Sequence, residues 1–299
     1  MSEIVSARVL AGCLAALISA AAWALGDILW SRIGEKISPC SMNIGKGILG
    51  SFYFLIVLLV IGARPVALRD VFFLGMSGVF GIAIGDTLFF ASLRNLGPRL
   101  ASLLGSLIPV CIAFSAFIFL KERPSYWTLL GILLTVTGLT WVLMEHTPPI
   151  GVVKNRSLGI KCGLMAVVCT TAGVLLAKVG VKSSPTIEAA SIRLIFGVLG
   201  LMAGGLVSRQ LKVWVAPLTR LRLIRDISFA VFVVVFGGFW MSMVALKYAD
   251  ASVAGALTAT TPLFMLPLVA IMQKEKISFR ACLGAFIAVA GVTLIMIRN

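Results

Sequence analysis

The chain has 299 residues, of which 60% are hydrophobic and only 12% are charged, and its mean hydropathy is +1.08. Soluble domains are roughly half apolar and about a quarter charged, so this composition excludes a soluble globular protein. The net charge of +15 comes from lysines and arginines that cluster at the ends of apolar runs. This placement indicates anchoring at lipid headgroups and argues against nucleic-acid binding.

The apolar runs are long and continuous, which predicts an all-α, polytopic membrane protein. Only helices and closed barrels satisfy the backbone in lipid, and barrel strands would alternate in polarity. Charges and prolines divide the chain into about ten helices of spanning length. We expect these helices at residues 9–31, 40–62, 71–93, 99–120, 125–144, 158–180, 186–207, 223–247, 252–273 and 277–297.

The first expected helix carries a carboxylate between two tryptophans, in the stretch WALGDILW. Trp23, Asp27 and Trp30 are four and three residues apart, so they share one helical face. Asp27 could bind a substrate amine, with the indoles stacking on the substrate, or it could carry a coupling proton. Alternatively, it neutralises Lys46 or Arg193, and the tryptophans are interface anchors.

Three more ionisable residues lie within expected helices: Lys46, Asp86 and Arg193. Glycines recur every three or four residues from 75 to 85, which predicts a close helix–helix approach beside Asp86. Asp86 is a candidate proton site or a structural hydrogen-bond acceptor. Lys46 and Arg193 could bind a substrate carboxylate or phosphate, or they could form ion bridges with Asp27 and Asp86.

Two prolines lie inside the fourth and ninth expected helices. Pro109 and Pro262 each remove a backbone hydrogen bond, so we expect kinks that act as hinges or shape a cavity. Thr260 and Thr261 place hydroxyls near the carbonyls that Pro262 frees. Trp240, in the eighth helix, is a candidate for aromatic surface at the binding site.

The two halves of the chain repeat one another. Residues 102–138 and 255–291 align without a gap at an offset of 153, so that a proline, a Lys-Glu pair, a serine and two glycines coincide. We therefore expect two five-helix units, residues 1–147 and 148–299. Because five is odd, the second unit enters the membrane inverted, which is typical of secondary transporters with a substrate site near mid-membrane.

The doubled Pro…Lys-Glu…Gly…Gly pattern in about ten helices resembles the EamA-type transporters of the drug/metabolite transporter superfamily. The resemblance implies no bound cofactor, a central cavity that opens alternately to each side, and export or exchange of metabolites such as amino acids. Glu122 and Glu275 would then be loop or gate residues at opposite membrane faces. The resemblance also implies cytoplasmic termini, although that orientation places more lysine and arginine outside than inside.

These features predict a secondary transporter of the inner membrane for a small polar or amphipathic metabolite. Its expected partners are this substrate, membrane lipids and, as a further candidate, protons. The sequence holds no Walker loop, dinucleotide fingerprint or CxxC pair, which argues against an enzyme, an ATPase and a metal site. Two alternatives remain open: a carrier or flippase of a lipid-linked or phosphorylated solute, and a non-transporting receptor or assembly subunit.

Overall fold

The computed structural model describes residues 2–34, 37–96, 101, 104–105, 107–145, 155–261, 263–264, 267–268 and 279–298. Up to residue 145 the helices are α1 (Ser2–Gly34), α2 (Pro39–Ile61), α3 (Leu68–Ser77), α4 (Thr87–Leu96), α6 (Ile108–Ser115) and α7 (Tyr126–Glu145), with π-helical segments η1 (Gly78–Asp86) and η2 (Ala116–Leu120). From residue 156 they are α8 (Arg156–Val181), α9 (Thr186–Val207), α10 (Leu211–Val215), α11 (Leu221–Phe232), α12 (Met241–Tyr248), α13 (Ala251–Thr258) and α15 (Phe279–Arg298), with a short 3₁₀ turn η3 (Ala216–Thr219) and a π-helical segment η4 (Val233–Trp240).

The fold is that of an all-α, polytopic membrane protein. Among the described residues, six helical stretches are long and apolar enough to span a membrane: Ala7–Trp30, Pro39–Ile61, Leu68–Leu96, Arg156–Val181, Thr186–Val207 and Leu223–Tyr248. Three shorter apolar helices are Ile108–Leu120, Tyr126–Trp141 and Leu283–Ile295. With α13 they make about ten helices, which confirms the predicted fold class.

Helices α2 and α8 begin where the sequence provides a side-chain cap. Ser38 accepts a hydrogen bond from the backbone N–H of Ser41 at 3.2 Å, and Pro39 occupies the first turn of α2. Asn155 caps α8 in the same way, through the N–H of Leu158 at 3.0 Å. These two helices accordingly begin within two residues of the expected starts at 40 and 158.

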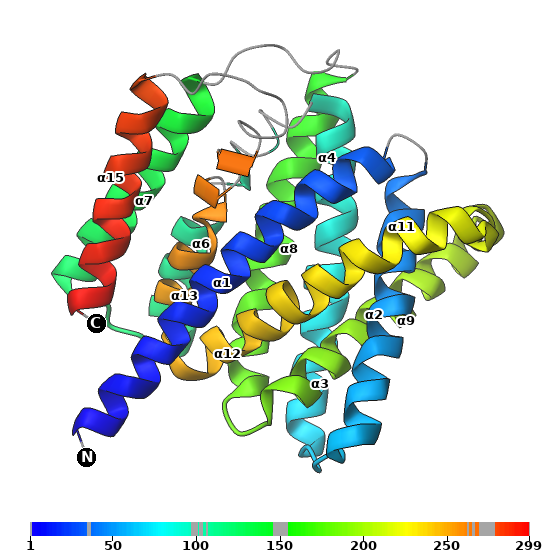
Figure 1. The fold of residues 1–299 in the computed structure, drawn as a ribbon, viewed down its shortest axis with the longest axis horizontal. Coiled ribbons are helices and arrows are strands. Elements are labelled where there is room, and N and C mark those ends of the chain that lie inside the picture. The colour runs from blue at the N-terminus through cyan, green and yellow to red at the C-terminus, as the bar shows by residue number, and fades with distance from the viewer. Residues whose placement is uncertain are drawn as a thin grey trace.

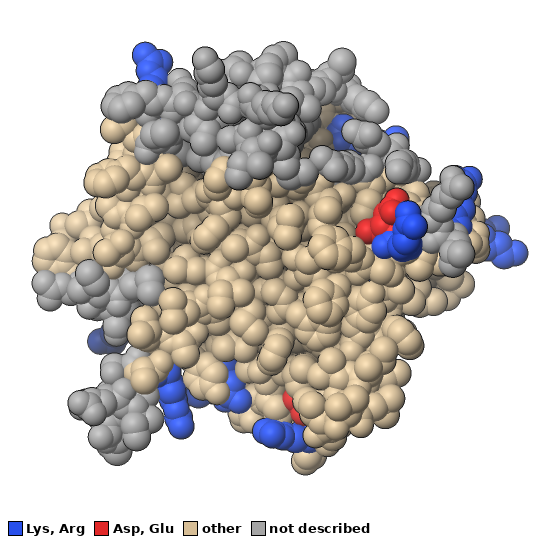
Figure 2. All heavy atoms as spheres, in the orientation of Figure 1, with Lys and Arg blue, Asp and Glu red and all other residues tan. Residues whose placement is uncertain are grey.

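The surface between the helix ends is apolar. Phe52, Phe114 and Phe286 are 55%, 67% and 72% exposed, which is acceptable in lipid because acyl chains, unlike water, impose no cost on exposed apolar side chains. Figure 2 shows lysine, arginine, aspartate and glutamate toward the margins of one face, with a broad uncharged area between them. This distribution fits a protein whose outer surface contacts acyl chains.

The helices pack in a way that places η1 and η4 inside the bundle. The segment α3–η1–α4 packs along α8 and α9, while α11–η4–α12 packs along α1, which crosses the bundle diagonally (Figure 1). The predicted close approach beside Asp86 is confirmed, because a Cβ on Gly173 of α8 would lie 2.8 Å from the Cα of Gly81. Helices α7 and α15 pair with each other at one edge (Figure 1).

Pro109 lies in the first turn of α6, just after a turn at Leu107, and the described residues Ala101, Leu104 and Gly105 before that turn are also helical. The helical run is therefore interrupted beside Pro109, and its role as a hinge stays a prediction. Proline is well tolerated there, because the first turn has no use for its missing N–H. Pro262 lies outside the described residues, but Thr261 donates to the carbonyl of Thr258 at 2.9 Å, as the sequence predicted.

Candidate functional site

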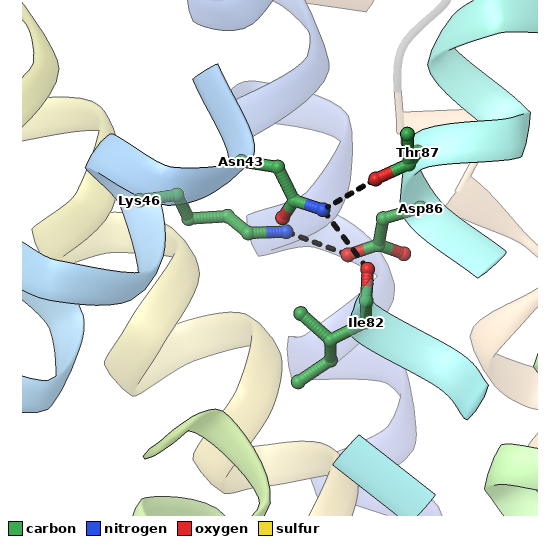
Figure 3. Close-up of polar contacts among 5 residues, drawn as sticks. All are labelled: Asn43, Lys46, Ile82, Asp86 and Thr87. Atoms are coloured by element: carbon green, nitrogen blue, oxygen red, sulfur yellow. Dashed lines mark hydrogen bonds and ion pairs between the residues drawn. The ribbon is translucent and has the colours of Figure 1, made fainter. Parts of the chain in front are cut away.

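The centre of the candidate site is an ion pair between two spanning helices. Nζ of Lys46, on α2, lies 2.6 Å from Oδ2 of Asp86, at the end of η1 (Figure 3). The lysine side chain is 3% exposed and the aspartate side chain 30% exposed. The ion bridge that the sequence offered as an alternative therefore forms at Lys46 and Asp86.

A second side chain of α2 holds the same turn of the neighbouring helix. Asn43, one turn before Lys46, donates to the carbonyl oxygen of Ile82 at 2.9 Å and to the hydroxyl of Thr87 at 3.3 Å (Figure 3). Asp86 lies between these two partners in the chain. The Asn43 amide thus holds the backbone of this turn at Ile82, and the Lys46 ammonium holds its carboxylate at Asp86.

The remaining two intramembrane charges lie within electrostatic reach of this pair. Asp27 of α1 interacts with both Asp86 and Lys46, and Arg193 of α9 interacts with Asp86. Arg193 is 8% exposed, and its Nε has no hydrogen-bond partner among the described residues. In the described part of the chain, neither Asp27 nor Arg193 forms a direct ion pair. The four charges therefore converge, but only two of them are neutralised by contact.

Aromatic rings adjoin the ion pair. Nζ of Lys46 lies 5.2 Å from the ring centre of Phe239 and 5.9 Å from that of Phe90, which are cation–π distances. Trp23 meets Phe239 edge-on, with ring centres 5.0 Å apart. The ion pair is therefore bordered by apolar aromatic surface.

The other two predicted tryptophans take different positions. Trp30 is 4% exposed, and its Nε1 has no partner among the described residues. Trp240 donates to the hydroxyl of Thr186, at the start of α9, at 3.1 Å. Trp23 is therefore the tryptophan whose contacts lead to the ion pair.

The two π-helical segments occupy corresponding places in the sequence repeat. At the offset of 153 residues, Gly85 corresponds to Gly238 and Asp86 to Phe239, so η1 and η4 overlap. Long π-helical stretches are rare in proteins. Where π-helical turns do occur, they are often found at functional sites, because the wider turn redirects side chains. Here one π-helix ends at the Asp86 carboxylate and the other contributes the Phe239 ring.

Glu122 lies away from the four charges, in the connection that follows η2. Its carboxylate accepts hydrogen bonds from the backbone N–H groups of Ala251 at 2.8 Å and Ser252 at 3.3 Å, and from the Ser252 hydroxyl at 3.0 Å. Helix α13 has no side-chain cap from its own first residues, so Glu122 supplies that cap. Its predicted counterpart Glu275 lies outside the described residues.

Comparison with known proteins identifies the family of the chain. The model of the EamA-like transporter family matches residues 10–144 and again residues 157–297. The chain belongs to the EamA-like transporter family. This EamA-like transporter is 22% identical over 294 residues to a protein named "Uncharacterized transporter" from Archaeoglobus fulgidus, which covers 95% of this chain and 97% of the relative. It also shares the fold of a protein solved by crystallography, with a TM-score of 0.72 at 16% identity over 97% of this chain and 96% of the other.

Sequence reasoning missed some residues of the site in this EamA-like transporter. Asn43 carries no charge and lies in an apolar helix, and Phe90 and Phe239 are two of 18 phenylalanines. The offset of 153 was a usable signal for Phe239, since it pairs that residue with Asp86. No comparable signal pointed to Asn43, whose role depends on contacts with another helix.

Proposed function

We propose that this EamA-like transporter is a secondary transporter of the inner membrane that exports or exchanges a small, amphipathic, amino-acid-like metabolite. One observation carries the proposal. The Arg193 guanidinium and the Asp27 carboxylate lie near the Lys46–Asp86 pair, and neither forms a direct ion pair of its own among the described residues. A zwitterionic substrate supplies a carboxylate to Arg193 and an ammonium to Asp27. The nearby rings suit an apolar or aromatic side chain.

We also propose that the units 1–147 and 148–299 are inverted repeats related by a pseudo-two-fold axis in the membrane plane. The helix pairings support it. Helix α8 packs on α3–η1–α4 and α6, and α1 packs correspondingly on α11–η4–α12 and α13. The expected counterparts α2 and α9, α6 and α13, and α7 and α15 pack on one another, as elements beside such an axis would.

Alternating access requires one end of the bundle to be closed when the other is open. Four connections at one end, residues 62–67, 121–125, 182–185 and 249–250, are joined by hydrogen bonds to each other or to neighbouring helices, and we call this the tied end. The bonds are Arg64 N to Glu188 (3.0 Å), Ser183 and Ser184 to Asp70 (2.6 and 3.0 Å), Lys247 to Ser184 O (2.7 Å), Lys178 to Ala249 O (2.5 Å), and those of Glu122 with Ala251 and Ser252. These ties support the view that the present conformation is closed at this end, with Glu122 as a gate residue.

Replacing Glu122 with alanine is expected to open the tied end more often. The change removes the cap of α13, which costs about 0.5–2 kcal/mol and shifts the equilibrium up to roughly 30-fold. A reporter cysteine at Ala249, which is 3% exposed, in a background without native cysteines, should react faster with a water-soluble maleimide. The exposed neighbour Arg123 provides the control, because Arg123→Ala should leave the labelling rate unchanged. Equal rates in the two variants would contradict a gate at Glu122.

The experiment that tests the proposed function is flux into liposomes that contain the purified protein. Amino acids, nucleosides and phosphorylated metabolites are first ranked by thermal shift, since a ligand of the folded state raises its stability. Saturable flux of a zwitterionic solute supports the proposal. Saturable flux of a phosphorylated solute supports the alternative carrier, and binding without flux supports a receptor.

Replacing Asp27 with asparagine is expected to weaken binding of the zwitterionic solute by about 1.5–3 kcal/mol, the value of a hydrogen bond to a charged group. The measurement is the dissociation constant in detergent, compared with counterflow in liposomes. Retained exchange with loss of proton-driven flux would instead assign Asp27 to proton coupling. Unchanged binding and flux would remove Asp27 from the site.

A further inference from the structure

Asn43 has a fixed orientation in the candidate site. Its side chain is fully buried, and it faces the carbonyl oxygen of Ile82 at 2.9 Å. A carbonyl oxygen only accepts hydrogen bonds, so the Asn43 atom that faces it must be the donor Nδ2. The second Nδ2 hydrogen is directed to the hydroxyl of Thr87 at 3.3 Å. The amide oxygen is therefore held on the other side of the group.

That oxygen is left without a partner. Oδ1 of Asn43 is buried and accepts no hydrogen bond from any described residue. A buried acceptor without a donor is unfavourable, and such groups in native proteins call for an explanation. The cation one turn away does not satisfy it either, because Nζ of Lys46 bonds to Asp86 at 2.6 Å and forms no hydrogen bond with Oδ1 of Asn43. The carboxylates of Asp27 and Asp86 have no proton to donate when they are ionised.

We propose that Asn43 is a substrate-binding residue whose Oδ1 accepts a hydrogen bond from an ammonium or amine group of the substrate. This assignment rests on the proposed transport function and adds a neutral acceptor to its two charged groups. An ammonium has three donors, so it can bond to both Asn43 and the Asp27 carboxylate. The residue type is restrictive: aspartate would turn an oxygen toward the Ile82 carbonyl, and leucine would offer neither donor nor acceptor.

Asn43 also links the ligand to the turn that carries Asp86. The amide group is planar and rigid, so a ligand bonded at Oδ1 restrains the same plane that holds Ile82 and Thr87. The π-helix η1 ends within this turn, at Asp86. Occupancy of the acceptor therefore stabilises the turn in the arrangement that pairs Asp86 with Lys46.

The test uses three probes that differ in one group: L-phenylalanine, 3-phenylpropionate, which lacks the amine and any other N–H donor, and phenethylamine, which lacks the carboxylate. Dissociation constants are measured for the purified full-length protein in detergent. Asn43→Leu should weaken phenylalanine and phenethylamine at least tenfold and should change 3-phenylpropionate less than twofold. Thr87→Val removes the hydrogen bond from Asn43 Nδ2 to the Thr87 hydroxyl and leaves Oδ1 in place. It should not alter the ratios between the dissociation constants of the three probes.

The outcomes separate binding from structural support. Equal weakening of all three probes by Asn43→Leu, or no weakening, overturns the assignment. Where the leucine variant does not fold, Asn43→Ala decides, because it removes the same acceptor without adding bulk: a tenfold loss of the preference for the amine-bearing probes supports the assignment, and an undiminished preference overturns it. A wild-type protein that binds none of the probes overturns the proposed substrate class together with this assignment.

Discussion

Replacing Asp86 with asparagine is expected to lower the free energy of unfolding by about 3–5 kcal/mol, because the change leaves a buried ammonium without its carboxylate. The side chain of Lys46 is 3% exposed, and its Nζ lies 2.6 Å from Asp86. The nearby rings of Phe90 and Phe239 offer only a partial substitute for a full negative charge. Thermal or denaturant unfolding in detergent micelles measures the loss.

Two comparisons make this result specific to the pair. The double change Lys46→Met with Asp86→Asn removes both charges and should recover most of the stability, since an apolar replacement of a buried pair is often neutral. The exposed pair Arg225–Asp226, 4.0 Å apart and 84% and 46% exposed, gives the matched control. Asp226→Asn should cost less than about 1 kcal/mol. A cost for Asp86→Asn as small as that of the control would contradict a stabilising role for the buried pair.

The same double variant separates stability from transport. If the Lys46–Asp86 pair only holds helices together, the folded double variant should still transport. If the pair orients the substrate beside Asp27 and Arg193, the double variant should fold and transport poorly. The proposed site predicts the second result, because both charges border the groups that we assign to the substrate.

The helices could be predicted from the sequence because lipid imposes one requirement on every spanning segment. A long apolar run must be a helix, and a charge or a cap marks its end. Ser38 with Pro39 and Asn155 are such marks, and α2 and α8 begin beside them. Asp27, Lys46, Asp86 and Arg193 were identifiable for the converse reason, since a charge within such a run is expensive.

What the sequence could not predict depends on contacts between helices. Nothing in the local sequence distinguishes a π-helical turn from an α-helical one at η1. The choice of Asp86 over Asp27 as the partner of Lys46 follows from which helices pack together. The apolar run around Pro109 is continuous in the sequence, and the turn at Leu107 that precedes α6 has no local sequence signal beyond the proline itself. Glu122 was singled out as a loop or gate residue, but nothing in the sequence indicated its cap on α13, which joins residues 129 and 130 positions apart.

Replacing Gly291 with alanine is expected to destabilise the protein by about 1–3 kcal/mol, although alanine is the better helix former. A Cβ on this residue of α15 would lie 2.6 Å from the carbonyl oxygen of Gly131 and 2.6 Å from the backbone nitrogen of Thr135, both on α7. These are backbone atoms, which cannot move aside as a flexible side chain can. The two helices must therefore separate, and the contacts along the rest of the pair weaken.

The matched control is the same substitution where space is available. A Cβ on Gly204, near the end of α9, would meet nothing within 4 Å, so Gly204→Ala should be neutral or stabilise by up to about 1 kcal/mol. At the other end of the α7–α15 contact, a Cβ on Gly138 would lie 2.5 Å from the carbonyl oxygen of Gly284. Gly138→Ala should therefore resemble Gly291→Ala. The double variant should lose less than the sum of the two, because a helix displaced by one methyl group already accommodates the second. An unchanged free energy of unfolding in both Gly291→Ala and Gly138→Ala would show that α7 and α15 separate without cost. The close backbone contact between the two helices would then have no part in holding the bundle together.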